Sequence, residues 1–371
     1  MTVRTRIASA LLLLAIAPLA GGFVAGLPAA FTEIPPLTRY IDHAPFARLP
    51  FVLFGALGLL AAGLLLKPSR FGFGRPSENL KPETCNLELP SWFWIGLALN
   101  LLSWFCAWTR PSWLGPLRDH TFTPLWLGYI LVMDGLVFRR TGRSMLASQP
   151  RLFLALFPVS SLVWWYFEFL NRFVQNWWYE GITQFTAGRY VLFATLCFST
   201  VLPAVFETCQ WLLSFPWFRS AYAQGPRWRA SSSLPLRVVA WTGIAGLILL
   251  ALAPNPMFFM TWLAPLALLG ATLSLAGIRT PFSDAGRGDY GPLFALAVAA
   301  LMCGFFWEMW NFLSLPKWHY SVPYVNAAHL FEMPAVGYTG YLPFGPVCWC
   351  LWTAAQQLLR PGSEDAILRP R

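Results

Sequence analysis

The chain has 371 residues, of which 57% are hydrophobic and 11% are charged, and its mean hydropathy is +0.53. This composition excludes a soluble globular protein and predicts an integral membrane protein in a lipid bilayer. A net charge of +10 would suggest a nucleic-acid partner for a soluble chain. The sequence has no basic and aromatic pattern of that kind, so we expect no nucleic acid.

Ten apolar segments are long enough to cross a hydrocarbon core of about 30 Å. In chain order, the expected spans are 7–29, 50–66, 91–108, 124–138, 152–171, 190–214, 238–253, 258–277, 292–312 and 334–359. The first segment also fits a cleaved signal peptide, because Arg4 and Arg6 precede it, but its apolar stretch continues to Ala30. We interpret it as a retained helix. The predicted fold class is an all-α, polytopic transmembrane bundle.

The basic residues are distributed unevenly between alternate loops. With a cytoplasmic N-terminus, 19 of the 26 Lys and Arg residues fall on the inner side and seven on the outer side. This pattern follows the positive-inside rule. It predicts a multi-pass protein of the cell membrane with both termini in the cytoplasm.

An aromatic motif occurs twice, 140 positions apart. Residues 165–168 read Trp-Tyr-Phe-Glu and residues 305–308 read Phe-Phe-Trp-Glu, with an asparagine three positions after each glutamate. The repeat continues as Trp-x-Tyr at 177–179 and 318–320, and as Leu-Pro at 202–203 and 342–343. These repeats lie four spans apart, which predicts two three-helix units with the same orientation.

The expected organisation has four parts. Residues 1–110 would form an N-terminal three-helix block, 111–237 the first repeat, 238–257 a connector helix, and 258–371 the second repeat with a cytoplasmic tail. Parallel repeats occur in carriers and in enzymes, so this organisation leaves both functions open.

A carboxylate in an apolar helix indicates a functional site, because it is costly to bury in a bilayer. Glu168 and Asn171 share a helix face, as do Glu308 and Asn311, since each pair is three residues apart. Nearby aromatic side chains would desolvate the carboxyl groups and favour their proton-donating form. The structural alternative is that both glutamates hydrogen-bond to the opposite repeat as interhelical contacts.

We therefore predict catalytic roles for five residues and ligand-binding roles for seven. Glu168 and Glu308 would be acid and base, oriented by Asn171 and Asn311. Glu207 is a further intramembrane acid, whereas Asp134 is interpreted as a boundary residue. The residues expected to bind the ligand are Trp165, Trp177, Tyr179, Trp307, Trp318, His319 and Tyr320.

Neither the histidines nor the cysteines predict a metal site or a disulfide framework. All four histidines fall in loops assigned to the outer side, where they could shuttle protons or hold a metal. No spacing matches a known metal motif, and six of the seven cysteines fall in or at the edge of spans. The long aromatic loops 172–189 and 313–333 could cover a cleft or anchor helix ends at the membrane surface. We expect no cofactor.

At these residues the chain resembles the membrane-integral lycopene cyclases of the bacterial heterodimeric and fungal fused type. The shared layout is an acid late in a helix, a Trp-x-Tyr about nine residues later, and a subsequent proline. It runs from Glu168 to Pro203 and from Glu308 to Pro343. The resemblance implies acid–base chemistry on an isoprenoid with no redox cofactor consumed. The family's Pro-x-Glu-Glu is absent after both prolines, which points to a different substrate.

The leading hypothesis is a protein that binds a hydrophobic, isoprenoid or lipid-like ligand in a carboxylate-lined cleft between the repeats, as a cyclase, isomerase or hydratase. The alternative is a proton- or cation-coupled carrier or a non-catalytic lipid-binding protein, because intramembrane carboxylates also carry coupled protons.

Overall fold

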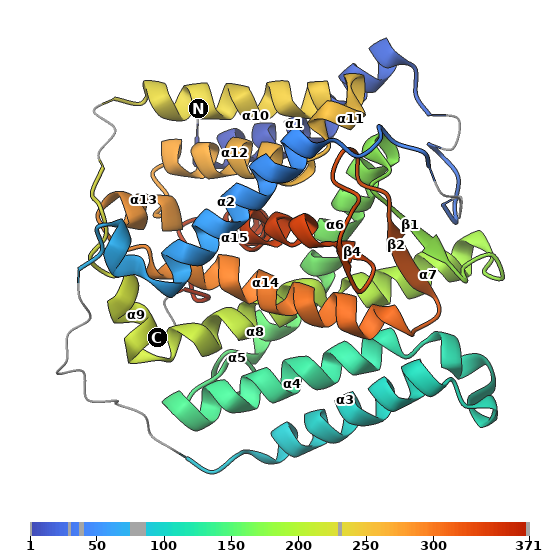
Figure 1. Ribbon diagram of the computed structural model, residues 1–371. Helices are drawn as coiled ribbons and strands as arrows, with labels where there is room; N and C mark the ends of the chain where they lie inside the picture. Colours follow the sequence, from blue (N-terminus) through green and yellow to red (C-terminus); the bar gives the residue numbers. More distant parts are fainter. Residues whose placement is uncertain (1, 29–30, 37–40, 75–86, 229–231, 369–371) are drawn as a thin grey trace.

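The computed structural model describes residues 2–28, 31–36, 41–74, 87–228 and 232–368. Within them the chain forms fifteen α-helices, three 3-10 helices and four short strands (Figure 1). The strands form only two small pairs, so helices build the fold. This confirms the predicted all-α bundle.

The longer helices are α1 (Val3–Ala25), α2 (Arg48–Leu66), α3 (Ser91–Thr109), α4 (Phe122–Thr141), α6 (Pro150–Val174), α7 (Ala187–Phe198), α8 (Val201–Leu213), α10 (Leu234–Leu252), α12 (Met260–Leu275), α14 (Gly291–Phe312) and α15 (Tyr341–Leu359). The shorter helices are α5 (Met145–Ser148), α9 (Pro216–Tyr222), α11 (Pro254–Met257), α13 (Pro281–Gly286), η1 (Pro68–Phe71), η2 (Ser112–Asp119) and η3 (Ala335–Gly340). The strands are β1 (Trp177–Glu180), β2 (Lys317–Tyr320), β3 (His329–Leu330) and β4 (Met333–Pro334).

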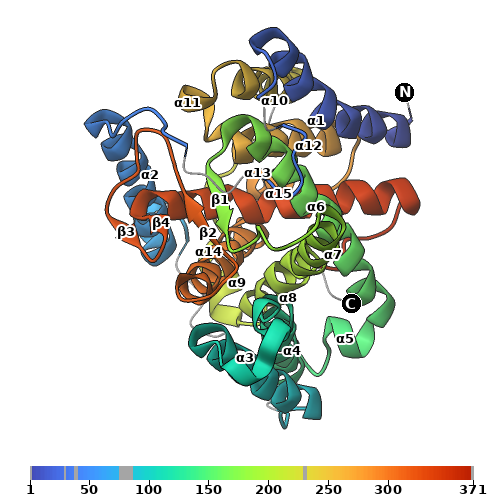
Figure 2. The ribbon, with the colours of Figure 1, turned by 90° about the vertical axis from the view of Figure 1, so that its right-hand side faces the viewer.

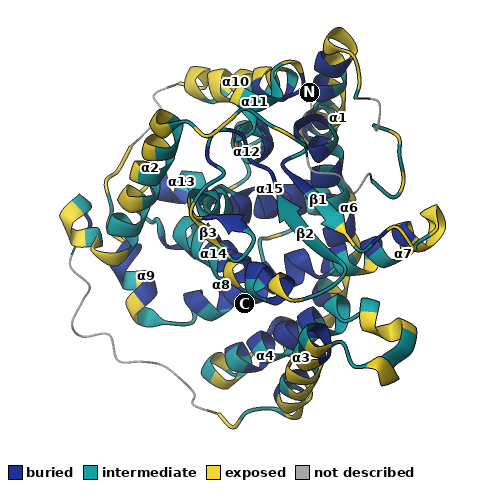
Figure 3. Ribbon diagram, turned by 45° about the vertical axis from the view of Figure 1, so that its right-hand side comes forward, coloured by how far each residue is buried: buried dark blue, intermediate teal, exposed yellow. Residues whose placement is uncertain are grey.

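Eight helical segments of the described chain are long and apolar enough to cross a membrane, with α7 and α8 forming one segment. The apolar helix α12 is shorter, at 16 residues, and the 19-residue α15 is largely buried within the bundle. Large apolar side chains face outward on α2 and α10, where Leu59 is 77% and Trp241 69% exposed (Figure 3). Because such surfaces belong in lipid, the protein is a multi-pass membrane protein.

The expected sixth span is broken into α7 and α8. Pro203 has no N–H group to donate to the preceding helical turn, so the helix cannot continue unchanged there. The hydroxyl of Ser160 on α6 bridges the break, because it donates to Phe198 O (2.6 Å) and accepts from Leu202 N (3.0 Å). One side chain thus satisfies two backbone groups freed by the break.

The expected tenth span is broken at the equivalent place. Its first residues form η3, and α15 begins at Tyr341, two residues before Pro343. In the first repeat α8 begins at Val201, also two residues before its proline, Pro203. The Leu-Pro repeat seen in the sequence therefore marks the same structural feature twice.

The predicted N-terminal block is corrected by the structure, because its three helices each pack mainly on other parts of the described chain. The helix α1 packs on α10 and α12, α2 lies against η3, and α3 packs on α4 (Figures 1 and 2). The contact between α1 and α10 depends on Gly21, where an added Cβ atom would lie 2.3 Å from Ile248 O. The helices α1, α2 and α3 are therefore spread around the bundle.

The buried centre of the bundle contains α8, α14 and α15, and α14 and α15 pack closely at Gly345 (Figure 3). A Cβ atom at Gly345 would lie 2.0 Å from the backbone oxygen of Leu296, which cannot rotate away.

We expect Gly345→Ala to destabilise the protein by about 3 kcal/mol or more, at the upper end of overpacking effects. Thermal unfolding in detergent measures the loss. The control Gly188→Ala, where nothing lies within 4 Å, should unfold like the wild type, and an equally stable Gly345→Ala variant would contradict the packing.

The two motif helices end at the same side of the bundle. The strand β1 follows α6, β2 follows α14, and the two strands pair antiparallel. The pairing brings together the segments that follow α6 and α14, on the side of the bundle where both helices end (Figure 1). This arrangement brings the two motif copies to one site.

Candidate functional site

The two Trp-x-Tyr segments form a small two-stranded ribbon, which we call the aromatic ribbon (residues 177–180 and 317–320). Its register places Trp177 opposite Tyr320 and Tyr179 opposite Trp318. Each tryptophan of one repeat therefore faces the tyrosine of the other. Sequence reasoning treated these residues as loops, because a four-residue strand gives too short a pattern to identify alone.

Glu168 is buried on α6 and accepts three hydrogen bonds at its Oε1 atom. The donors are the Tyr179 hydroxyl (2.5 Å), the Trp177 indole (2.9 Å) and the Trp164 indole (3.2 Å). Two of them come from the aromatic ribbon directly after the helix. Glu168 thus fixes the side chains of its own Trp-x-Tyr segment.

Glu308 is fully buried on α14 and makes the equivalent contact. Its Oε1 atom accepts from the hydroxyls of Tyr320 (2.7 Å) and Tyr341 (2.7 Å). Its Oε2 atom is buried and has no hydrogen-bond partner among the described residues. A buried carboxyl oxygen without a partner is unusual in folded proteins and marks this glutamate as a place where a proton can be bound.

The two motif asparagines bind backbone rather than the carboxylates. Asn171 Nδ2 donates to Trp177 O (2.8 Å), and its Oδ1 accepts from Trp177 N (3.4 Å). Asn311 makes the same pair of bonds with Trp318, at 2.7 and 2.9 Å. The prediction that they orient the glutamates is corrected. A carboxamide is complementary to a peptide group, so each asparagine holds its strand at the helix end.

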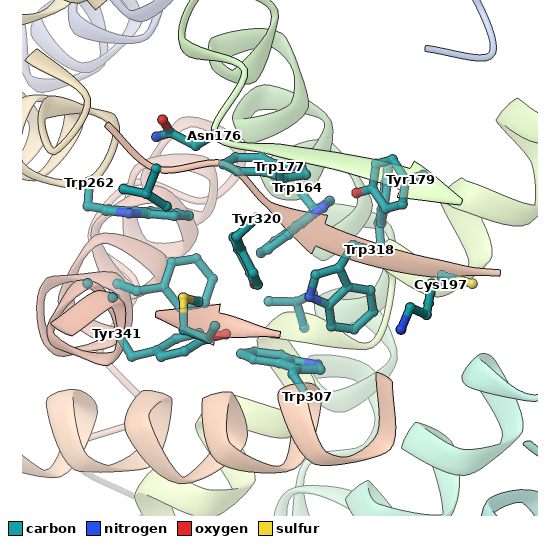
Figure 4. A pocket seen from close by; sticks show the side chains of 18 of the residues that line it. Trp164, Asn176, Trp177, Tyr179, Cys197, Trp262, Trp307, Trp318, Tyr320 and Tyr341 are labelled. Carbon is teal, nitrogen blue, oxygen red and sulfur yellow. The ribbon is translucent and has the colours of Figure 1, made fainter. Parts of the chain in front are cut away.

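A cavity of about 550 Å³ lies beneath the aromatic ribbon (Figure 4). Figure 4 shows Trp262 and Tyr341 on one side of it and Trp318 and Cys197 on the other. The lining is almost entirely apolar and comes from both repeats; its aromatic members include Trp164, Trp177, Tyr179, Phe198, Trp262, Trp307, Trp318, Tyr320, Tyr341 and Phe344. The volume falls within the range of about 300–1,000 Å³ that small-molecule sites occupy.

The carboxyl groups themselves do not line this cavity. Its wall includes Tyr179, Tyr320 and Tyr341, whose hydroxyls donate to Glu168 or Glu308 behind them. The predicted carboxylate-lined cleft is thus corrected to an aromatic cavity with tyrosine–glutamate pairs in its wall. In each repeat the phenol is the polar group that a ligand would meet first.

Three other predicted residues lie away from the cavity wall. Trp165 faces α7, where its indole donates to Thr195 Oγ1 (2.9 Å). Glu207 is buried on α8 near Asp134 of α4, and neither of its carboxyl oxygens has a hydrogen-bond partner among the described residues. His319 is on the aromatic ribbon but lies outside the cavity lining. Trp177, Tyr179, Trp307, Trp318 and Tyr320 do line the cavity.

His319 joins the two repeats in a polar network. It contacts Glu180 Oε2 (2.8 Å) and Glu332 Oε2 (3.1 Å), and Lys317 donates to Glu332 Oε1 (2.5 Å). Burial alone would raise the pKa of Glu332, but its hydrogen bond and ion pair with Lys317, and its contacts with His319, hold that pKa below its usual range. In the described part of the chain, no group of three or more His, Cys, Asp and Glu side chains is arranged to hold a metal.

Asp134, expected at a boundary, is fully buried. It accepts from the Trp92 indole (2.9 Å) and from Leu146 N (2.9 Å), and Glu207 lies against it. It is covered by α3, α5 and α8, which all pack against α4. Sequence position alone could not reveal this cover.

Sequence reasoning missed several cavity residues. Tyr341 has no counterpart in the first repeat, where Val201 occupies the equivalent position, so the repeat gave no signal for it. Trp262 lies on α12, outside both motif copies, and stacks on Trp177 with ring centroids 6.1 Å apart. Trp164 precedes the first motif copy by one residue and is not among the seven ligand-binding residues predicted above.

In comparisons with protein-family models, with curated proteins and with solved structures, nothing matches this chain.

Proposed function

We propose that this protein binds an elongated, unsaturated, isoprenoid-like lipid in the aromatic cavity and converts it by acid–base chemistry, as a cyclase, isomerase or hydratase. The observation that carries the proposal is the tyrosine–glutamate pair present in both repeats at one apolar cavity. Aromatic walls favour such a ligand because ring faces pack on π-systems and attract cations. No redox cofactor is needed for this chemistry.

A proton on Glu308 can reach the ligand through Tyr320 once the hydrogen bond between them reverses, so that the carboxyl O–H donates to the phenolic oxygen. The phenol donates its proton to an alkene carbon while the carboxyl proton moves to the phenolic oxygen. A C–H bond forms, the ligand becomes a carbocation, and Glu308 is left as a carboxylate. Loss of a proton from a neighbouring carbon to the pair formed by Tyr179 and Glu168 restores an alkene and balances the charge.

The surrounding rings would stabilise the intermediate cation. Trp307 stacks on Tyr341, and Trp262 stacks on Trp177, so broad ring faces form much of the wall. A cation within about 6 Å of a ring centroid gains roughly 2 kcal/mol when it is desolvated. Several such rings together would lower the barrier to forming a carbocation.

The resemblance to membrane-integral lycopene cyclases supports this class of reaction. It rests on Glu168, Glu308 and the two Trp-x-Tyr segments, which are the residues around the cavity. The family's paired glutamates after the proline have no counterpart there, since Glu207 lies against Asp134 instead. We therefore propose a ligand other than lycopene.

We place the protein in the cell membrane with both termini in the cytoplasm. This orientation is supported by the basic residues, because 19 of them fall in the loops and tails assigned to the inner side and seven in those assigned to the outer side. The aromatic ribbon then lies on the extracytoplasmic side, together with Lys317 and His319.

Lipid bound to the purified protein tests the proposal. We expect mass spectrometry of the extract to identify an isoprenoid in about equal molar amount to the protein. Ala194→Phe fills the cavity from α7 and should lower that amount at least tenfold, while Leu192→Phe, on the exposed side of the same helix, should not. Both variants are first required to elute as single species. An extract with only bulk phospholipid, unchanged by Ala194→Phe, would contradict the proposal.

A second candidate function is a proton-coupled carrier, favoured by the buried Asp134 and Glu207 carboxyl groups. They form a second intramembrane acid pair, outside the cavity lining. In liposomes a carrier would move the extracted lipid in a pH-dependent way without changing its mass or mobility, whereas the proposed enzyme would change its chromatographic mobility.

A further inference from the structure

One end of the cavity contains a histidine that the proposed chemistry does not use. His120 lies between η2 and α4 and lines the cavity together with Thr123 and Cys197. Its ring stacks on Phe193, with centroids 3.8 Å apart, and lies 5.8 Å from that of Phe185. The imidazole is thus held in place by aromatic packing.

The ring nitrogens of His120 have no hydrogen-bond partner among the residues that the structure describes, although the backbone N–H donates to Leu117 O. Elsewhere in the chain, His43 and His319 each use both ring nitrogens in hydrogen bonds, and His329 uses one. A histidine that lines a cavity, is ordered by stacking and has no partner at either ring nitrogen is suited to bind a ligand.

The surroundings of His120 favour a neutral group over an anion. Asp119, which also lines the cavity, is paired with Arg110 (3.1 Å), and Lys317 at the same cavity is paired with Glu332. Burial lowers the pKa of His120; the charge of Asp119 opposes this shift and that of Arg189 adds to it, so the neutral imidazole is favoured. Arg110 and Lys317 are thus engaged by carboxylates, and Arg189, whose charge also acts on His120, does not line the cavity.

We propose that the His120 end of the cavity is a subsite for the hydroxyl group of a prenyl alcohol, whose chain lies along the aromatic wall. A neutral imidazole has one donor and one acceptor, and a hydroxyl group has both complements. The inference rests on the proposed function, because it assigns the polar end of the same ligand. It makes the substrate an amphiphile with one polar end.

Binding of two matched probes to the purified wild-type protein tests the subsite. The probes are geranylgeraniol and the C20 hydrocarbon that lacks its hydroxyl, and the signal is quenching of tryptophan fluorescence, because five indoles line the cavity. We expect the alcohol to bind about three- to tenfold more tightly, as one or two neutral hydrogen bonds allow. Geranylgeranyl diphosphate should bind more weakly than the alcohol.

Two variants separate the subsite from the rest of the cavity. His120→Phe keeps a ring to stack on Phe193 and should bind both probes equally, with the affinity for the hydrocarbon unchanged. His120→Gln keeps a donor and an acceptor and should retain part of the preference. The control His329→Phe, outside the cavity, should retain the full preference.

The outcomes distinguish the inference from the proposed function. Equal binding of both probes to the wild type, tighter binding of the diphosphate, or an undiminished preference in His120→Phe would each overturn the hydroxyl subsite while leaving a lipid-binding cavity. If neither C20 probe binds the wild type, the proposed function is contradicted and the inference fails with it.

Discussion

Glu308→Leu is expected to destabilise the protein by about 2–5 kcal/mol, whereas Glu308→Gln should fold almost like the wild type. Leucine removes the acceptor of two tyrosine hydroxyls, Tyr320 and Tyr341, in a fully buried position. Each unsatisfied buried hydroxyl costs about 1–3 kcal/mol. Glutamine keeps an oxygen that can accept both bonds but cannot carry the exchangeable proton.

The substitution Glu308→Gln, which should preserve the stability of the fold, is expected to abolish most of the catalytic activity. In Glu308→Gln the conversion of the extracted lipid is expected to fall about 100- to 10,000-fold, the usual range for losing a general acid or base. Thermal unfolding in detergent and chromatography of the lipid product measure the two effects separately. Tyr338→Phe is a matched control, because the hydroxyl of Tyr338 donates to Leu330 O and not to Glu308.

One outcome would contradict a catalytic role for the two glutamates. If the double variant Glu168→Gln and Glu308→Gln still converts the lipid at the wild-type rate, both glutamates only anchor tyrosines. They would then be the structural contacts between helices that the sequence also allowed. Any acid–base chemistry would then have to use other residues.

The fold could be predicted from the sequence because apolar length alone determines which segments cross a membrane. The predicted boundaries fail at prolines: Pro203 and Pro343 lie within apolar runs, yet the helices α8 and α15 begin two residues before them. The apolar character of a segment does not show where its backbone hydrogen bonds are interrupted, so these helix breaks could not be predicted from it. The side chain of Ser160, which bridges the first break, comes from another helix and cannot be assigned from local pattern.

The sequence identified several residues of the candidate site but not how they are arranged in space. Repetition identified Glu168, Glu308 and both Trp-x-Tyr segments, because a rare intramembrane acid occurs twice at one spacing. Which group faces the ligand could not be predicted, since the phenol of Tyr320 lies in front of its carboxylate only after the ribbon folds back over the helix end. Tyr341 reaches the same carboxylate from α15, a contact that the sequence repeat does not contain.

The asparagines make a second large effect testable. In the double variant Asn171→Ala and Asn311→Ala we expect the aromatic ribbon to lose its attachment to α6 and α14. Each substitution removes two hydrogen bonds to a tryptophan backbone, Trp177 or Trp318, and leaves a peptide group without its partner. At about 1–3 kcal/mol for each such loss, the two together would release the ribbon without unfolding the bundle.

Hydrogen exchange measured by mass spectrometry reports this release directly, through peptides that cover residues 177–180 and 317–320. We expect their exchange to accelerate at least tenfold, and lipid to be lost from the purified protein, because the ribbon covers the cavity that holds it. Asn100→Ala is the matched control: it removes a bond to Leu125 O between α3 and α4 and should leave ribbon exchange unchanged. Wild-type exchange in the double variant would mean that strand pairing and the tyrosine–glutamate bonds suffice to hold the ribbon. In that case Glu168 and Glu308, and not the two asparagines, would be the residues that hold the ribbon over the cavity.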